Sequence, residues 1–159
     1  SFLAGFIIWI YHRQLFNSYK YGFILLSFLG LLCFFLFPTA PPWMVAETFN
    51  LPFQRIILNQ TILSHFQGLT VVYYFINNNL VAALPSLHTA WPVFTSLFLA
   101  HNFPSWKSKL SLIIPIMISF SVVLTGEHFI IDVVLGWLLA SLTINIINST
   151  YDQTHQRYP

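Results

Sequence analysis

The sequence predicts an all-α protein, a polytopic transmembrane bundle of about five to six helices with a short interfacial segment. The chain of 159 residues is 57% hydrophobic and only 6% charged, whereas a soluble domain carries about 25% charged residues. Its apolar residues gather in runs, several of them close to the length of about 17–25 residues that a span needs. The 17 Phe, 5 Trp and 7 Tyr supply aromatic anchors for the interfaces. We expect one membrane-embedded domain over residues 1–159.

The first part of the sequence predicts the end of one helix and one complete membrane-crossing helix. The run Ser1–Tyr11 is too short to cross a bilayer alone. We expect it to be the end of a helix whose start is missing, so that the domain is incomplete at its N-terminus. Tyr21–Phe37 is long enough to cross, and Pro38 stops it. The pair Pro41–Pro42 then predicts an extended segment.

The stretch from Val45 to Leu84 is the least regular part of the chain. Polar residues interrupt it too often for a span, namely Glu47, Asn50, Gln54, Arg55, Asn59 and Gln60. A short amphipathic helix on the membrane surface, opening at Leu51–Pro52, fits its apolar residues. Residues 69–76 are too short to cross, and either pack against the bundle or dip into the interface.

Three later runs predict crossing helices: Ser86–Asn102, Leu110–Leu124 and Phe129–Ile147. Pro92 falls in the second turn of the first of these helices, where it disturbs only early hydrogen bonds. Pro115 predicts a kink in the second.

Counting crossings places three stretches on the same side of the membrane. If each of the four complete helices crosses once, residues 38–43, 85–88 and 125–132 share a face. The opposite face carries the cations Arg13, Lys20, Lys107, Lys109 and Arg157, whereas the shared face carries only Arg55. Because Lys and Arg favour the cytoplasmic side, we expect the shared face to open to the periplasm, the cell exterior or an organelle lumen.

Two histidine motifs lie on this shared face. One is Leu84-Pro85-Ser86-Leu87-His88, and the other runs from Thr125 to Asp132 and contains His128. Histidine is costly in a membrane unless it has a partner or a function. His128 and Asp132 are four residues apart and would share one helix face, so the carboxylate would accept from one ring nitrogen and leave the other more basic. With a second histidine nearby, this pattern predicts nucleophilic attack with acid catalysis.

The order of the motifs resembles a known superfamily. Pro85-Ser86-x-His88 followed by His128-x-x-x-Asp132 is similar to the second and third signatures of the type-2 phosphatidic acid phosphatase superfamily. The upstream phrase, by which we mean the motif Phe37-Pro38-Thr39-Ala40-Pro41-Pro42-Trp43, is similar to a motif in the branch that contains the inositol phosphorylceramide synthases and their bacterial relatives. The resemblance covers roughly residues 21–148. It implies an integral membrane lipid phosphatase or phosphotransferase that needs no metal or other cofactor.

The resemblance also implies substrates and roles. The substrate would be phosphatidic acid, a polyprenyl diphosphate, or a phospholipid that donates a phosphoalcohol to another lipid. His128 would attack the phosphorus and form a phosphohistidine, and Asp132 would fix its tautomer. His88 would protonate the leaving lipid alcohol and then activate water or a second alcohol. Ser86 follows Pro85 as an expected helix N-cap, and the start of that helix would contact the phosphate.

The cations of the usual signatures are absent from their expected positions. Residues 38–43 stand where the family has a Lys and an Arg-Pro pair, and Val122 replaces an Arg. Arg55 is the one cation on the shared face, and it either folds back toward the phosphate or binds a headgroup. Glu127 either binds a substrate hydroxyl, raises the pKa of His128, or is a solvated first-turn carboxylate.

A non-catalytic membrane subunit that retains this fold is the alternative function. The missing cations favour it, whereas the complete set of His88, His128 and Asp132 favours an enzyme. No histidine pair has convincing metal-site spacing, the one cysteine, Cys33, permits no disulfide within the chain, and nothing indicates a nucleic-acid partner. The expected partners are the bilayer and a phosphorylated lipid; the sequence leaves open a homo-oligomer or a partner in a membrane complex.

Overall fold

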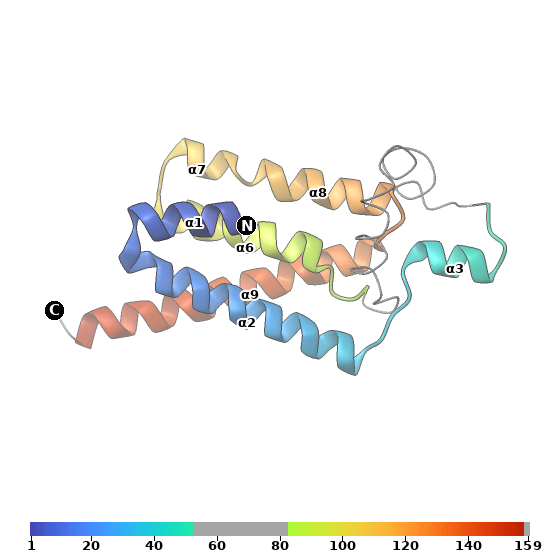
Figure 1. Ribbon diagram of the computed structural model, residues 1–159, viewed down its shortest axis with the longest axis horizontal. Helices are drawn as coiled ribbons and strands as arrows, with labels where there is room; N and C mark the ends of the chain where they lie inside the picture. The colour runs from blue at the N-terminus through green and yellow to red at the C-terminus, as the bar shows by residue number, and fades with distance from the viewer. Residues whose placement is uncertain (53–82, 158–159) are drawn as a thin grey trace.

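The computed structural model describes residues 1–52 and 83–157, with the backbone alone for residues 151–157. All the elements of secondary structure in these residues are helices (Figure 1), and the all-α prediction is confirmed there. The helices are α1 (Phe2–Tyr11), α2 (Arg13–Leu36), α3 (Pro42–Thr48), α6 (Leu87–Asn102), α7 (Trp106–Leu110), α8 (Ile113–Leu124) and α9 (Ile130–Arg157). The predictions for residues 53–82, including the body of the surface helix and the place of Arg55, lie outside the described residues.

Three stretches are long and apolar enough to cross a membrane: Arg13–Leu36, Trp106–Leu124 and Ile130–Thr150. Together they identify an integral membrane protein. The predicted crossing by α6 stays a prediction, because that helix has 16 residues and therefore extends over only about 24 Å.

α6 is the centre of the bundle, and it packs against α2, α8 and α9. Its buried side chains are Thr89, Ala90, Val93, Phe94, Thr95, Ser96 and Phe98. Leu26 of α2 and Ala140 of α9 join the apolar members of this set in one buried cluster. The helix that begins with the first histidine motif is therefore the one held most firmly by its neighbours.

Polar side chains tie the helices to one another inside the apolar bundle. The indole of Trp91 donates to Ser27 Oγ at 3.1 Å and joins α6 to α2. The indole of Trp137 donates to Ser119 Oγ at 3.0 Å and joins α9 to α8. Such bonds contribute about 0.6 kcal/mol each between membrane helices, and their directionality helps to fix how the helices are rotated.

Two helix starts differ from the prediction. The extended conformation predicted for Pro41–Pro42 is right for Pro41 alone (φ −71°, ψ 160°), because α3 begins at Pro42. A proline is favourable at the first helical position, where its missing N–H has no helical partner. α2 begins at Arg13 rather than Tyr21, and Tyr19 in this added part packs against Phe94 and Phe98 of α6.

The helix predicted for Leu110–Leu124 is interrupted at Ser111–Leu112, one turn before Pro115. Pro115 has no N–H to donate to the carbonyl of Ser111, four residues earlier. Ser96 of α6 donates to that carbonyl instead, at 2.9 Å. The predicted kink is thus a break between α7 and α8, stabilised by a hydrogen bond from the central helix.

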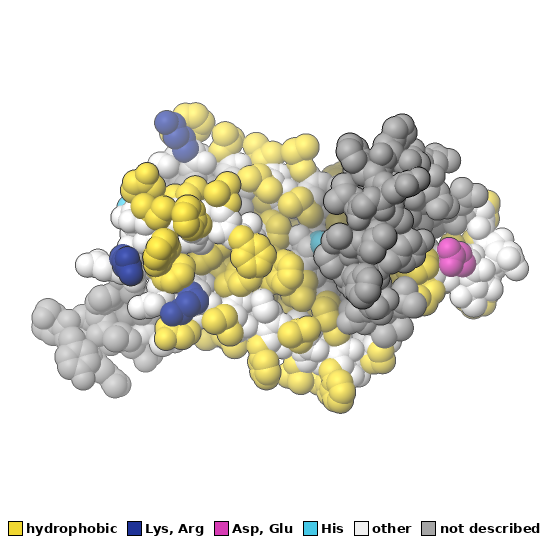
Figure 2. Space-filling model, viewed as in Figure 1, with side chains coloured by type: hydrophobic (Ala, Val, Ile, Leu, Met, Phe, Trp, Pro, Cys, Tyr) yellow, Lys and Arg dark blue, Asp and Glu magenta, His cyan; other side chains and the backbone are white. Residues whose placement is uncertain are grey.

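The motifs meet at one end of the bundle, where α2 and α8 end and α6 and α9 begin (Figure 1). The lysines and arginines with described side chains, which are Arg13, Lys20, Lys107 and Lys109, belong to the start of α2 and to α7 at the other end. Figure 2 shows dark blue basic side chains toward one end of the molecule and a magenta acidic side chain toward the other. The charge asymmetry expected from the sequence is therefore present along the long axis of the described chain.

Candidate active site

His128 lies in the short loop between α8 and α9. Gly126 in this loop has φ 74°, a left-handed conformation that glycine adopts without a steric cost. The N–H groups of Glu127 and His128 both donate to the carbonyl of Val122, at 3.0 and 3.1 Å. These bonds close the end of α8 and set His128 immediately before α9.

Asp132 lies in the first turn of α9 and caps that helix. Its Oδ2 accepts from the N–H of Phe129 at 2.8 Å, which satisfies one of the backbone donors left free at a helix start. Its distance to His128 Nδ1 is 3.6 Å, longer than a hydrogen bond. The predicted direct bond from the ring of His128 to Asp132 is therefore not formed; the carboxylate lies beside the ring without a hydrogen bond to it.

His128 Nδ1 donates a hydrogen bond to a backbone carbonyl that the sequence does not indicate. Nδ1 lies 3.0 Å from the oxygen of Ala83, and a carbonyl can only accept. Nδ1 therefore carries the proton, and Nε2 of the neutral ring has a lone pair.

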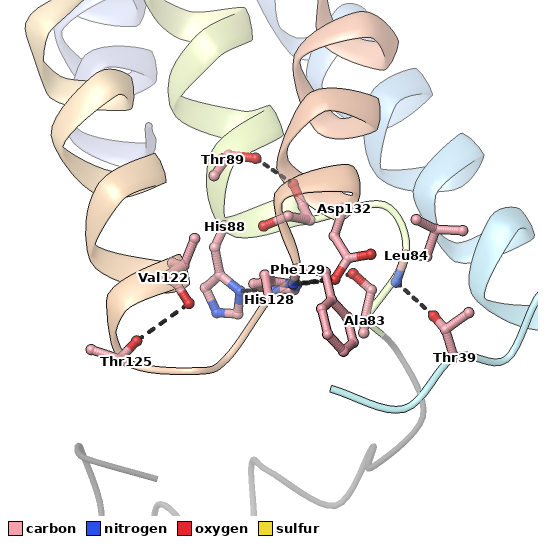
Figure 3. Close-up of polar contacts among 11 residues, drawn as sticks. Thr39, Ala83, Leu84, His88, Thr89, Val122, Thr125, His128, Phe129 and Asp132 are labelled. Carbon is pink, nitrogen blue, oxygen red and sulfur yellow. Dashed lines mark hydrogen bonds and ion pairs between the residues drawn. The ribbon is translucent and has the colours of Figure 1, made fainter. Parts of the chain in front are cut away.

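Nε2 of His128 lies 3.2 Å from Nδ1 of His88 (Figure 3). Because Nε2 is the acceptor, His88 Nδ1 must be the donor in this contact. The ring centroids are 5.4 Å apart and the ring planes are inclined by 57°. The structure thus brings together two histidines that are 40 residues apart in the sequence, with a lone pair on one facing a proton on the other.

The two rings have different environments. His128 is 5% exposed, whereas His88 is exposed. Burial, followed by the positive charge of His88, lowers the pKa of His128 to about 4; the Ala83 carbonyl and the charge of Glu127 oppose this shift. His128 is therefore neutral at physiological pH, the form in which a histidine is nucleophilic.

Ser86 is the N-cap residue of α6, as predicted, but its hydroxyl makes no capping bond. Its N–H donates to the carbonyl of Asp132 at 2.9 Å, and its carbonyl accepts from Thr89 Oγ1 at 2.9 Å. Ser86 Oγ is buried and has no hydrogen-bond partner among the described residues. An unpaired buried hydroxyl costs about 1–3 kcal/mol, so Ser86 is suited to receive a polar ligand atom.

Close contact between α6 and α9 depends on Gly136. A Cβ on Gly136 would lie 2.6 Å from the carbonyl oxygen of Ser86 and 2.6 Å from Thr89 Oγ1. Only glycine allows the two helix starts to approach this closely. This contact holds Ser86 beside the turn of α9 that contains Asp132.

The remaining predicted site residues differ in how far the structure describes them. Pro85 is buried and follows Leu84 through a cis peptide bond. Glu127 is partly exposed and acts on His128 by raising its pKa; this is one of the roles considered for it from the sequence. Arg55 lies outside the described residues. Within residues 1–52 and 83–157, no group of three or more His, Cys, Asp or Glu is placed to hold a metal ion.

Sequence reasoning missed Ala83, Thr39 and Gly136. Ala83 acts through its carbonyl, which every residue type has, so no sequence signal could have indicated it. Thr39 belongs to the upstream phrase, where it was noted only as part of a family pattern. Gly136 could have been found from its position within the predicted helix, four residues after Asp132, because a glycine inside a helix often indicates close packing against a neighbouring element.

Comparisons with known proteins show which family the chain belongs to. The family model of the PAP2 superfamily matches residues 1–146. The phosphoinositol dihydroceramide synthase of Bacteroides thetaiotaomicron is 27% identical over 138 residues, covering 78% of this chain and 43% of that protein. The chain therefore spans less than half the length of this relative. No solved structure matches the chain. The chain belongs to the PAP2 superfamily, the type-2 phosphatidic acid phosphatase superfamily that its motifs resemble.

Proposed function

We propose that this chain forms the reaction centre of a membrane lipid phosphatase or lipid phosphotransferase that works through a phosphohistidine at His128. One observation carries the proposal. His128 Nε2 presents a lone pair at 3.2 Å from His88 Nδ1, while its other ring nitrogen is held by the carbonyl of Ala83. A nucleophile and a proton donor therefore lie next to each other at one end of the bundle.

In the first step, His128 Nε2 attacks the phosphorus of the lipid. An N–P bond forms, and the P–O bond to the lipid alcohol breaks. His88 Nδ1 gives its proton to the leaving oxygen, because an alkoxide leaves poorly without an acid. Asp132, at 3.6 Å from His128 Nδ1, stabilises the positive charge that develops on the ring.

In the second step, His88 acts as the base. It takes a proton from water or from the hydroxyl of a second lipid, and that oxygen attacks the phosphorus. The N–P bond breaks and His128 returns to its neutral form. Hydrolysis and transfer follow the same path, and differ only in which hydroxyl reaches His88.

The phosphate group requires positive groups around it. The start of α6 offers free backbone N–H groups and a positive dipole end, and the buried hydroxyl of Ser86 has no other partner among the described residues. The described lysine and arginine side chains are at the opposite end of the bundle. We therefore assign the remaining charge to Arg55, or to a cation supplied from outside the described residues.

The substrate is proposed from the relative. That relative is named a phosphoinositol dihydroceramide synthase. We propose that this chain favours transfer, with a phosphoinositol lipid as donor and dihydroceramide as acceptor.

The reaction would take place at the non-cytoplasmic face, because the described cations lie at the other end of the bundle (Figure 2) and cations are favoured on the cytoplasmic side.

The experiment uses the purified full-length protein in detergent with a chelator present. Phosphate release is measured from dioctanoyl phosphatidic acid and from a polyprenyl diphosphate, and transfer is measured from phosphatidylinositol to dihydroceramide. We expect chelator-resistant turnover in one of these assays, and its loss in His128→Ala. His101→Ala is the matched control, since this exposed histidine lies at the far end of α6 and should leave turnover unchanged.

A non-catalytic membrane subunit is the second candidate function. The observation that favours it is the absence of a lysine or arginine near the histidine pair within the described part of the chain. If none of the assays shows turnover that depends on His128, this second candidate becomes the better account. Acid-labile phosphate bound to the wild type but not to His128→Ala would exclude it.

A further inference from the structure

The segment Thr39–Trp43 contacts both parts of the chain that bear the histidines. Thr39 is hydrogen-bonded to Ala83 and Leu84, at the start of the first histidine motif. The N–H of Trp43 donates to the carbonyl of Gly126 at 3.3 Å, in the loop that holds His128. The upstream phrase that marks the family branch thus lies beside the site in the structure.

Thr39 holds the segment before α6 through two hydrogen bonds. Its carbonyl accepts from the N–H of Ala83 at 3.3 Å, and its hydroxyl accepts from the N–H of Leu84 at 2.9 Å (Figure 3). Two consecutive N–H groups bound by one residue fix the direction of the peptide plane between them, because a peptide is rigid and planar. That peptide contains the carbonyl of Ala83.

The carbonyl of Ala83 is the group that sets the tautomer of His128. It accepts from Nδ1 at 3.0 Å, and the carboxylate of Asp132 is more distant, at 3.6 Å. If this carbonyl turned away, the proton could occupy either ring nitrogen. A proton on Nε2 would remove the lone pair that faces His88.

We propose that Thr39 is a positioning residue for His128: by binding Ala83 and Leu84, it aims the Ala83 carbonyl at Nδ1 and keeps Nε2 free for attack. The proposal rests on the proposed function for its catalytic consequence, but its structural part, the tautomer of His128, is measurable without turnover. The hydroxyl is the part that a substitution can remove, because the Thr39 carbonyl belongs to the backbone.

The test compares three variants of the full-length protein in detergent. Thr39→Val keeps the shape of the side chain but removes the acceptor for the N–H of Leu84, and Thr39→Ser restores it. Thr48→Val is the matched control, because the Thr48 hydroxyl donates only to the carbonyl of Met44 in its own helix, at 2.8 Å. Thermal unfolding of each variant checks that the fold is retained. If Thr39→Val does not fold, Thr39→Ala takes its place.

The first readout is the tautomer of His128, measured from the ¹⁵N chemical shifts of labelled histidine and assigned with His128→Ala. We expect protonated Nδ1 and unprotonated Nε2 in the wild type, Thr39→Ser and Thr48→Val. Thr39→Val should show a mixture of the two tautomers. A single unchanged tautomer in folded Thr39→Val would overturn the proposal.

The second readout is turnover with whichever lipid phosphate the enzyme accepts. We expect kcat to fall about tenfold in Thr39→Val, the size of effect seen when a group that orients the ring of a metal-ligating histidine is removed. KM should stay within about twofold of the wild-type value, and Thr39→Ser should recover kcat. Equal kcat in Thr39→Val and Thr39→Ser would contradict the positioning role while leaving the proposed function intact. A tautomer change without turnover in any variant or in the wild type would support the positioning role and contradict the enzymatic function.

Discussion

Nδ1 of His88 and Nε2 of His128 lie 3.2 Å apart, so the two rings bind each other directly. An in-line displacement places the nucleophile and the leaving oxygen on opposite sides of the phosphorus. The attack distance is about 3 Å, and the hydrogen bond from the acid to the leaving oxygen is about 2.8 Å. A phosphoryl group therefore does not fit between the nitrogens at the observed separation, and the rings must part when a substrate enters.

A phosphate analogue should separate the histidine pair. With orthovanadate bound in the transition-state geometry, we expect the distance between His88 Nδ1 and His128 Nε2 to rise to about 6 Å or more. The exposed ring of His88 should move, because His128 is buried and held by Ala83. A structure of the vanadate complex measures this distance. Vanadate bound beside rings that stay in contact would contradict the proposed roles.

Replacing His88 should affect substrates according to their leaving group. His88→Ala removes the proton donor, which contributes about 10²–10⁴-fold in general acid catalysis. We expect a loss of this size for a lipid alcohol, and a much smaller loss for an aryl phosphate whose leaving group needs no proton. The measurement is the rate of phosphohistidine formation with dioctanoyl phosphatidic acid and with p-nitrophenyl phosphate. An equal loss with both substrates would mean that His88 does not act as the acid.

The low pKa of His128 predicts how stability depends on pH. His128 titrates at about 4 in the folded chain and near 6.5 when unfolded. Between these values the unfolded chain binds more protons, so the free energy of unfolding falls as the pH is lowered from about 6.5 to about 4. Unfolding in detergent across this range measures the effect. His128→Gln should be less sensitive to pH than the wild type, and identical slopes would contradict the assigned pKa.

The sequence predicted the helices where the hydrophobic pattern alone decides them. The two clearest spans, Tyr21–Phe37 and Phe129–Ile147, fall within α2 and α9 except for one terminal residue each, Phe37 and Phe129, because long apolar runs have few alternatives in a membrane. The start of α2 was missed because residues 13–20 are more polar and are held as a helix by the packing of Tyr19 on α6. That packing is tertiary, and it has no signal within the segment itself.

The candidate site was predictable as a set of side chains but not as a network. The motif order brings His88 and His128 to one end of the bundle, and the structure places the rings in contact. The bond that His128 donates to the Ala83 carbonyl and the cap at Phe129 could not be foreseen, because both involve backbone atoms. A spacing of four residues indicates that two side chains are neighbours, but it does not tell which of several acceptors each one binds.

Asp132 should have two separable roles, and two substitutions distinguish them. Asp132→Asn keeps an oxygen for the N–H of Phe129 but removes the negative charge near His128. We expect phosphohistidine formation to slow at least about tenfold, since opposite charges about 4 Å apart interact by up to about 4 kcal/mol at an effective dielectric constant of about 20. The melting temperature in detergent should change little.

Asp132→Ala removes the cap as well as the charge. We expect the same loss of rate as in Asp132→Asn together with a loss of stability of about 1 kcal/mol, the usual effect of removing a capping side chain. Rates of phosphohistidine formation and melting temperatures, measured on both variants in parallel, separate the two contributions. If Asp132→Asn keeps the full rate and only Asp132→Ala loses it, the carboxylate serves α9 as a cap and its charge has no part in activating His128.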